Sequence, residues 1–433
     1  MDAIEKIHEF ERFGSVLGLE RISSLLHLLG DPQDDLKYIH VAGTNGKGSV
    51  CRYLYSTLIE AGYSTGIYIS PFIEKFNERI ELNAEYISDS DLQIYTDRVL
   101  EQVKVMTGRG EDSPTEFEVI TAVGFLYFKE KGADVVVLEV GLGGTGDSTN
   151  VIREPLASVI ASISYDHTDR LGNTLAEIAS NKAGIIKDRC PVITSCTAKE
   201  ALEVIERTAE EHDSMFFETG KLPVEITEET VDGTTFSVDI QGVRFDDIRI
   251  GMPGRHQVEN AVCALAALCI TEETGALNIP RDAIYRGFAK ARQPGRFEKV
   301  NGMIKADVPC DVILDGAHNP DGARALKDGF SRLYPGKKVL MLTGMLKDKD
   351  VSAAMDEFAD ITHDFIVTEP PNPRKMSAAE LAAHLRDKGC RAMAFGDYHD
   401  ALDMALAAAK DYDVVVMTGS LYLIGALRAC LHE

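Results

Sequence analysis

The sequence contains no tryptophan and no run of apolar residues long enough to span a lipid bilayer. Basic residues are scarce, because 45 lysines and arginines stand against 69 aspartates and glutamates, for a formal net charge of −24. This excess of negative charge argues against nucleic acid and anionic membranes as partners. An acidic protein that binds an anionic ligand must gather its few cations locally, so lysines and arginines in glycine-rich loops gain interest.

None of the eight cysteines forms a C-x-x-C pair. Cys263 and Cys269 lie in apolar helical segments, so we interpret the cysteines as reduced core residues. We expect neither a disulfide framework nor a zinc site. Residues 1–20 are amphipathic and charged, unlike a signal peptide. Together these features predict a cytoplasmic protein.

The length of 433 residues predicts at least two domains, and Pro294-Gly295 marks a linker between them. In residues 1–294, strands and helices surround two glycine-rich loops, and a polar segment of about 215–250 predicts a small antiparallel β insertion. In residues 295–433, strands and helices alternate regularly. The sequence therefore predicts an α/β protein: a parallel-sheet ATPase domain with a P-loop, followed by a Rossmann-like doubly wound domain.

The first glycine-rich loop, residues 41–49, lies between a predicted strand and a predicted helix. Glycines let backbone N–H groups face an anion, Lys47 supplies a positive charge, and Ser49 can reach a metal. The loop departs from G-x-x-x-x-G-K-[ST] in having Val41 at the first glycine and Gly48 after the lysine. We predict a nucleotide phosphate site, formed by Gly43, Thr44, Asn45, Gly46, Lys47, Gly48 and Ser49.

Polar residues follow three predicted strands of this domain. Glu139 ends a buried strand, and a buried carboxylate needs a partner such as Mg²⁺. Ser70 and His167 follow two other strands, which makes a shared metal plausible, although a lone histidine is more often a structural hydrogen-bonding group. Lys182 lies in a helix that ends at an apolar turn, and its simplest interpretation is a lysine whose charged end reaches solvent.

Two further segments have the character of ligand-binding loops. Residues 70–80 mix charged and aromatic side chains without a clear period, which suggests either a loop that meets a ligand or a solvated turn. Phe72 and Arg79 are its candidates for substrate contact. A second glycine-rich loop, residues 141–150, follows the strand that Glu139 ends, and open α/β sheets bind ligands at that edge.

Eight ordered motifs, spread from Ile39 nearly to the C-terminus, resemble the folylpolyglutamate synthases. This family includes bifunctional dihydrofolate synthases and belongs to the Mur ligase superfamily. The motifs are GTNGKGS, SPFIEKFNERI, DVVVLEVGLGG, YDHTDRLGNTLAEIASNKAGIIK, GRHQVENA, GRFE, ILDGAHNP and GSLYL. The resemblance implies that ATP phosphorylates a pteroate or folate carboxylate and that the amine of L-glutamate attacks the acyl phosphate.

The resemblance also implies roles for individual residues. Metal ligands for two Mg²⁺ ions would be Ser70, Glu139, His167 and Lys182, the last as a carbamylated lysine. Asn260, Arg296 and Asp315 would contact the nucleotide, and His318 and Ser420 would lie near the glutamate. We count Lys47, Lys182, Asp315 and His318 as catalytic. A carboxylate such as Asp315 suits ribose hydroxyls, whereas an arginine suits phosphate.

The pteridine side resembles the family through Thr115, Phe117, Glu118, Gly146, Asp147 and Ser148. Phe117 offers a flat stacking face. The chain departs from the family after the double glycine, where it has Thr145 and Gly146 in place of arginine and leucine. It departs again at Asn181, where the family often has glutamate before the carbamylated lysine.

Other functions are alternatives. A non-catalytic binding protein on this scaffold would not need Glu139, His167 and Lys182 together. A monofunctional folylpolyglutamate synthase would lack activity on dihydropteroate, and a non-folate amide ligase would use a different acid. A Mur ligase for nucleotide-linked sugars would carry a uridine-binding domain before the ATP loop, but only about forty residues precede Gly43. A GTPase-like switch or kinase would need its own motifs, which we do not find. We therefore expect a cytoplasmic monomer whose ligands are ATP, Mg²⁺, L-glutamate and dihydropteroate or a reduced folate.

Overall fold

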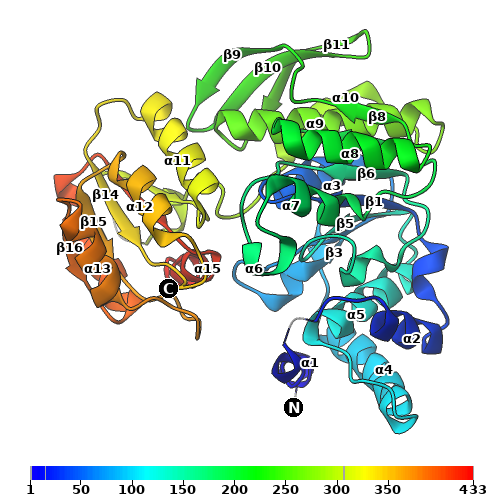
Figure 1. The fold of residues 1–433 in the computed structure, drawn as a ribbon. Helices are drawn as coiled ribbons and strands as arrows, with labels where there is room; N and C mark the ends of the chain where they lie inside the picture. The colour runs from blue at the N-terminus through cyan, green and yellow to red at the C-terminus, as the bar shows by residue number, and fades with distance from the viewer. Residues whose placement is uncertain (1, 15, 306–307, 433) are drawn as a thin grey trace. The chain divides into compact units, whose positions relative to one another are not determined.

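A computed structural model describes residues 2–14, 16–305 and 308–432 (Figure 1). Its contacts divide the chain into two compact units. The first unit comprises Met1–Glu225, Ser237–Ile248 and Glu259–Ala291, and the second comprises Ile226–Phe236, Arg249–Val258 and Arg292–Glu433. Each unit is built on its own sheet.

The first unit contains an eight-stranded sheet in the order β4-β3-β2-β5-β1-β6-β7-β8. Strands β2, β5, β1, β6, β7 and β8 run parallel, whereas β3 and β4 form an antiparallel edge. The strands are β1 (Tyr38–Ala42), β2 (Thr65–Tyr68), β3 (Ile80–Leu82), β4 (Glu85–Tyr86), β5 (Val135–Glu139), β6 (Ala157–Ile160), β7 (Val192–Thr194) and β8 (Phe216–Glu218). The predicted parallel sheet is confirmed, and the edge hairpin was not predicted.

Helices cover both faces of this sheet (Figure 1). They are α1 (Ala3–His8), α2 (Glu20–Leu28), α3 (Lys47–Glu60), α4 (Asp89–Gly108), α5 (Glu116–Glu130), α6 (Thr168–Leu171), α7 (Leu175–Ala183), α8 (Lys199–Glu211), α9 (Arg255–Glu273) and α10 (Arg281–Lys290). Alternate residues of the central strands face opposite sides: Tyr38, Val136 and Leu138 join the core formed with α1, α2, α4 and α5. His40 lies two residues after Tyr38 in β1 and therefore on the same face of the sheet. Glu139 lies on the other face, toward α3.

A buried ion pair fixes α3, the helix that begins at the first glycine-rich loop. Arg52 of α3 and Glu81 of β3 lie 2.5 Å apart, and both side chains are less than 10% exposed. The pair therefore holds the helix against the antiparallel edge of the sheet.

We expect Arg52→Leu to lower the free energy of unfolding by about 3–5 kcal/mol, because it leaves a buried carboxylate without its cation. The double variant Arg52→Leu/Glu81→Leu should recover most of this loss, since an apolar pair replaces a buried ion pair at little net cost. Urea unfolding of the wild type, both single variants and the double variant measures the coupling. A double variant no more stable than Arg52→Leu would contradict this expectation.

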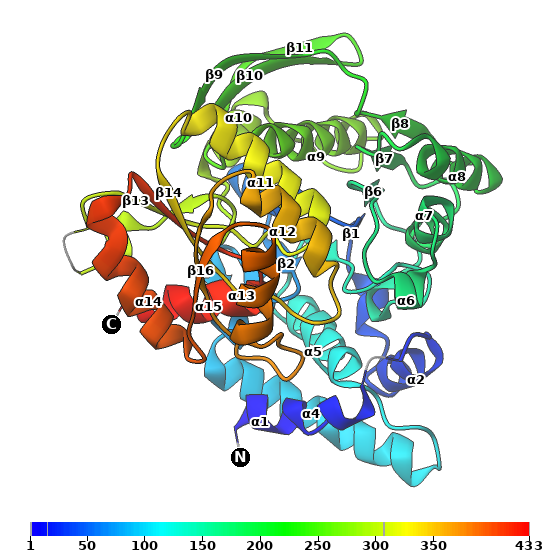
Figure 2. The same cartoon turned by 60° about the vertical axis from the view of Figure 1, so that its left-hand side comes forward.

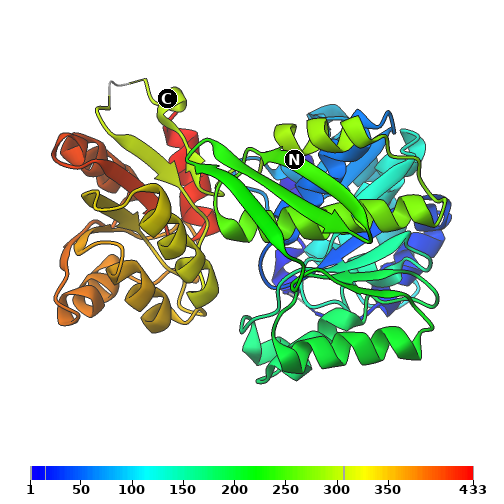
Figure 3. The same ribbon diagram turned by 90° about the horizontal axis from the view of Figure 1, so that it is seen from above.

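A three-stranded sheet follows β8 in the sequence, in the order β11-β10-β9 (Figure 3). Its strands are β9 (Val224–Thr230), β10 (Gly233–Ile240) and β11 (Val243–Ile250), and two-residue turns join them, as an antiparallel hairpin requires. The predicted insertion of about 215–250 is thus correct in kind but begins too early. Residues 216–218 are β8, which pairs in parallel with β7 in the main sheet.

The second unit contains a six-stranded sheet in the order β12-β13-β17-β14-β15-β16, parallel except for β12. Figure 2 labels β13, β14 and β16 of this sheet. The strands are β12 (Glu298–Lys299), β13 (Asp311–Leu314), β14 (Val339–Thr343), β15 (Asp364–Val367), β16 (Arg391–Ala394) and β17 (Val414–Thr418). Apolar cores lie on both faces, one with α11 (Pro320–Leu333), α12 (Val351–Ala359) and α13 (Ala378–Asp387), the other with α14 (Tyr398–Ala408) and α15 (Leu421–Cys430). The predicted doubly wound fold is confirmed.

All eight cysteines are free thiols, and six of them are buried. The interpretation of the cysteines as reduced residues stays a prediction. Within the described part of the chain, we found no helix with the length and apolar character needed to cross a membrane.

Candidate active site

The first glycine-rich loop is held between β1 and the segment that follows β6. Gly43 and Gly46 have positive φ angles of 149° and 84°. A Cβ on Gly43 would lie 2.8 Å from the Cβ of Ala161, and one on Gly46 would collide with Asn260. Both glycines are therefore required by backbone conformation and by space. The predicted nucleotide contact Asn260 lies directly against the loop.

Hydrogen bonds fix the rest of this loop to the segment after β6. The backbone N–H of Thr44 donates to the carbonyl oxygen of Ser162 at 2.7 Å, and its hydroxyl donates to that of Ser164 at 3.1 Å. Ser162 Oγ donates to the carbonyl oxygen of Asn45. Helix α3 begins at Lys47, with Ser49 buried in its first turn. The arrangement is a preformed helix N-terminus of the kind that binds phosphate.

Two lysines meet at one carbonyl oxygen of the loop. Lys47 Nζ lies 3.1 Å from the oxygen of Gly43, and Lys182 Nζ lies 2.9 Å from the same atom. Lys182 comes from the last turn of α7, and its side chain is buried. The interpretation of Lys182 as a lysine that extends to solvent is therefore wrong.

Burial first, and then the nearby charge of Lys47, lower the pKa of Lys182 to about 7, against weaker opposing effects of Asp166 and Asp147. A lysine with this pKa is about half neutral near pH 7, and the neutral amine is nucleophilic. This is the property that reaction with CO₂ requires.

Among the predicted metal ligands, Ser70 and Glu139 lie together. Glu139 ends β5, its side chain is buried, and its Oε2 accepts the backbone N–H of Ser70 at 3.1 Å. His167 follows β6, precedes α6 with a positive φ of 50°, and has its ring 3.9 Å from a carboxylate oxygen of Asp166. A carboxylate and a hydroxyl are ligands that Mg²⁺ prefers, so Glu139 and Ser70 fit the expected ion, whereas the metal role of His167 stays a prediction.

A different group of potential metal ligands was not predicted. Among the described residues, His8, Glu11 and Glu116 bring one nitrogen and two carboxylate oxygens within 4.8 Å of one another. His8 and Glu11 are exposed. Burial raises the pKa of Glu116, and the nearby Arg79 charge partly offsets this effect. Exposed charged groups of this kind are common without an ion, so we assign no metal here.

The second glycine-rich loop lies between the Phe117 ring and α7. A Cβ on Gly141 would lie 2.5 Å from Cζ of Phe117, so the ring covers the start of the loop. Gly144 packs on the backbone of Asn181 and Lys182, and the N–H of Thr145 donates to the carbonyl oxygen of Asn181. The two departures from the family pattern, at residues 145–146 and at 181, thus lie at one packing contact.

Several predicted substrate residues have structural roles. Thr115 and Glu118 form the capping box of α5, and Glu118 also pairs with Arg21 at 3.1 Å. Asp147 is buried and bonds within its own loop, where Ser148 is also buried. The carbonyl oxygen of Gly146 accepts the N–H of Gly18.

Phe72 and Arg79, from the charged and aromatic loop, do lie together. The Arg79 guanidinium is 5.3 Å from the centres of the Phe72 and Phe76 rings. This stacking orients a cation beside aromatic faces. The part from Phe76 to Arg79 is a short 3₁₀ helix and not the solvated turn that we considered.

In the second unit, Asp315 follows β13 and is buried beside Arg296. Its two carboxylate oxygens accept the backbone N–H groups of Phe297 and Ala317, each at 2.8 Å. Burial raises the pKa of Asp315, and the Arg296 charge partly offsets this effect. The carboxylate thereby joins the segment before β12, which carries Arg296 and Phe297, to the segment that follows β13.

His318 and Ser420 also lie at this carboxyl edge of the second sheet. His318 Nδ1 is 2.7 Å from the carbonyl oxygen of Gly316, which can only accept, so Nδ1 carries the proton and Nε2 is the basic nitrogen. Ser420 is buried at the start of α15, and its hydroxyl has no hydrogen-bond partner among the described residues. A buried hydroxyl of this kind suits a ligand contact.

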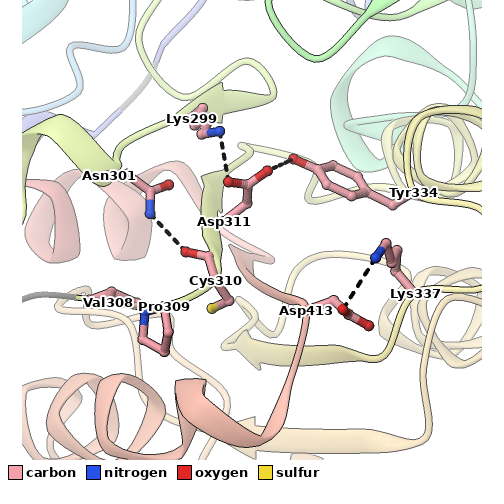
Figure 4. A pocket seen from close by; sticks show the side chains of 9 residues that line it. All are labelled: Lys299, Asn301, Val308, Pro309, Cys310, Asp311, Tyr334, Lys337 and Asp413. Carbon is pink, nitrogen blue, oxygen red and sulfur yellow. Dashed lines mark hydrogen bonds and ion pairs between the residues drawn. The ribbon is translucent and has the colours of Figure 1, made fainter.

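A pocket of about 390 Å³ lies elsewhere in the second unit, at the amino ends of β13 and β17 (Figure 4). Lys299 pairs with Asp311 at 2.7 Å, Lys337 pairs with Asp413 at 3.3 Å, and the Tyr334 hydroxyl donates to Asp311. The lysines of this pocket thus pair with carboxylates of its own wall. It lies at the sheet edge opposite to Asp315 and is separate from the candidate active site.

Two protein families match the chain. Residues 41–268 match the Mur ligase middle domain, and residues 295–421 match the glutamate ligase domain of Mur ligases. The dihydrofolate synthase/folylpolyglutamate synthase of Bacillus subtilis is 36% identical over 431 residues, which cover 99% of this chain and 98% of that protein.

Solved structures of folylpolyglutamate synthases also resemble this chain in sequence and in fold. A folylpolyglutamate synthase from Thermotoga maritima has a TM-score of 0.85 and 35% identity, with 99% of this chain and 96% of that chain covered. The Escherichia coli FolC in complex with DHPP and ADP has a TM-score of 0.88 and 30% identity, with 100% and 98% covered. The chain belongs to the dihydrofolate synthase/folylpolyglutamate synthase family of Mur ligases and is an ATP-dependent, amide-forming ligase.

Proposed function

We propose that this ligase joins L-glutamate to a folate and also to dihydropteroate, through an acyl phosphate. One observation carries the proposal: Lys182 connects the first glycine-rich loop, here called the phosphate loop (residues 41–49), with the second, here called the pteridine-side loop (residues 141–150). Its Nζ contacts the Gly43 carbonyl oxygen, while its backbone packs against Gly144. A triphosphate on the first loop and a carboxylate extending from the second loop would therefore meet near Lys182.

In the first step, a carboxylate oxygen of the pteroate or folate attacks the γ-phosphorus of ATP, and the bond to ADP breaks. Lys47 and the N–H groups at the start of α3 stabilise charge on the phosphates, with Asn260 beside Gly46. We propose Ser70, Glu139, His167 and a carbamylated Lys182 as ligands of Mg²⁺. The ion would supply charge neutralisation on the phosphate oxygens.

In the second step, the amine of glutamate attacks the acyl carbon and inorganic phosphate leaves. We propose His318 and Ser420 as its contacts, because Nε2 of His318 is basic and the Ser420 hydroxyl is buried without a hydrogen-bond partner among the described residues. The amine must lose a proton to attack, and Nε2 of His318 suits that transfer. Arg296 and Asp315 would bind the nucleotide phosphate and ribose.

The pteridine would stack on Phe117, next to Gly146, Asp147 and Ser148, with Phe72 and Arg79 nearby. The family matches support residues 1–294 as the ATP-binding domain and 295–433 as the glutamate-ligase domain. Free thiols suit a reducing compartment, so we propose a cytoplasmic enzyme, and we propose that it is a monomer.

A panel of substrates tests the proposal. Purified protein with ATP, Mg²⁺ and glutamate should release ADP and add one glutamyl residue to dihydropteroate and to tetrahydrofolate, measured by product mass. A product from tetrahydrofolate alone would show the monofunctional alternative. If neither dihydropteroate nor tetrahydrofolate supports ADP release, the protein would instead be a non-folate amide ligase.

A further inference from the structure

A buried chain of three side chains links β1 to the pteridine-side loop. His40, in the middle of β1, is fully buried, and its Nε2 lies 2.9 Å from Thr149 Oγ1. Thr149 Oγ1 lies 2.6 Å from Asp147 Oδ1. All three residues are at most 2% exposed. The chain joins residues 109 positions apart in the sequence.

The chemistry of the three groups sets the direction of these hydrogen bonds. An ionised Asp147 can only accept, so the Thr149 hydroxyl donates to it and must accept the proton of His40 Nε2. Burial lowers the pKa of His40 to about 3, which keeps the ring neutral with a single N–H. His40 is therefore a fixed donor at the end of the chain.

Asp147 uses this support to close the loop. Its Oδ2 accepts the N–H of Leu142 at 2.8 Å, and its Oδ1 accepts the N–H of Thr149 at 3.0 Å. One carboxylate thus joins the two ends of the loop, whose first residue, Gly141, lies under the Phe117 ring. No strand of the described sheet includes this loop. Its middle is anchored by the N–H of Thr145, which donates to the carbonyl oxygen of Asn181, whereas Asp147 is the side chain that joins its start to its end.

We infer that His40 and Thr149 are positioning residues that set the shape of the pteridine-side loop, and hence the affinity for the pteridine substrate. The inference rests on the proposed function and adds to it two residues that act through Asp147. The phosphate loop has separate anchors in Ser162 and Ser164, and β1 is paired on both sides with β5 and β6. Loss of the chain should therefore affect the folate and leave ATP binding unchanged.

The test compares Thr149→Val with Thr149→Ser. Valine keeps the shape and removes the hydroxyl, whereas serine keeps the hydroxyl. We expect Thr149→Val to raise KM for tetrahydrofolate about tenfold or more, with KM for ATP within about twofold of the wild type. Thr149→Ser should stay within about twofold for both substrates. Equal KM values for tetrahydrofolate in the two variants, or an equal rise in both KM values in Thr149→Val, would overturn the inference.

A second pair covers the case in which Thr149→Val does not fold. His40→Gln retains an N–H donor and should keep the KM for tetrahydrofolate closer to the wild-type value than His40→Leu does. Thermal unfolding identifies the folded variants, and a pair with equal KM values would again overturn the inference. A wild-type protein that glutamylates neither dihydropteroate nor tetrahydrofolate would instead contradict the proposed function.

Discussion

Replacing Lys182 with alanine is expected to reduce turnover by at least about 10²-fold, the scale of losing one preorganised electrostatic contact. The reason lies in the position of the amine, which is buried and shares the Gly43 carbonyl oxygen with Lys47. Two ammonium groups at one oxygen repel each other and would repel Mg²⁺. Reaction with CO₂ removes this conflict, because the neutral amine forms an N–C bond, releases a proton and becomes an anion.

The dependence on CO₂ and pH separates a carbamate from an ordinary buried lysine. Protein prepared without CO₂ should gain activity when bicarbonate is added. Because the pKa of Lys182 is about 7, the neutral amine predominates above that pH and falls to about one tenth near pH 6. Activity at limiting CO₂ should therefore fall as the pH drops below 7.

Short carboxylic acids provide a further check, since acetate can place an anion in the space that Lys182→Ala leaves. Partial recovery with acetate supports the carbamate, and Lys199→Ala, at an exposed lysine of α8, serves as a control that should match the wild type. Near-normal activity of Lys182→Ala would rule out the carbamate.

Much of the fold follows from local pattern. The glycine loop between β1 and α3 and the alternating strands and helices of the second unit carry strong periodic and turn signals. The hairpin of β3 and β4 was missed because its strands have only three and two residues, too few for a period. The first strand assigned to the β insertion is β8, because a short polar strand does not reveal which sheet it joins.

The candidate site was less predictable where side chains act over long sequence distances. Thr115-x-x-Glu118 is a capping-box pattern that the sequence already displays, so their structural role could have been recognised. His40 and Thr149 gave no such signal. The role of a histidine within an apolar strand cannot be recognised from the sequence, because its partner, Thr149, is brought to it only by the fold. The burial of Lys182 depends likewise on the packing of α7 against the phosphate loop.

Lys47→Ala is the second large effect that we expect, with a loss of about 2–4 kcal/mol of transition-state stabilisation, or roughly 30- to 1000-fold in turnover. Lys47 is the first residue of α3, and its amine lies within 3.3 Å of the carbonyl oxygens of Gly43 and Thr44. It is therefore positioned to place a charge at phosphates held by the loop. Steady-state ADP release measures the loss of turnover, and calorimetric titration with ATP measures the loss of ATP affinity.

Lys104→Ala, at an exposed lysine of α4, is the matched control and should leave both measurements unchanged. Lys47→Ala should also raise the pKa of Lys182, because it removes the neighbouring positive charge. More bicarbonate would then be needed to reach the remaining activity at a given pH, which links the two lysines experimentally. Unchanged ATP affinity and turnover in a folded Lys47→Ala protein would show that the loop is not the nucleotide site.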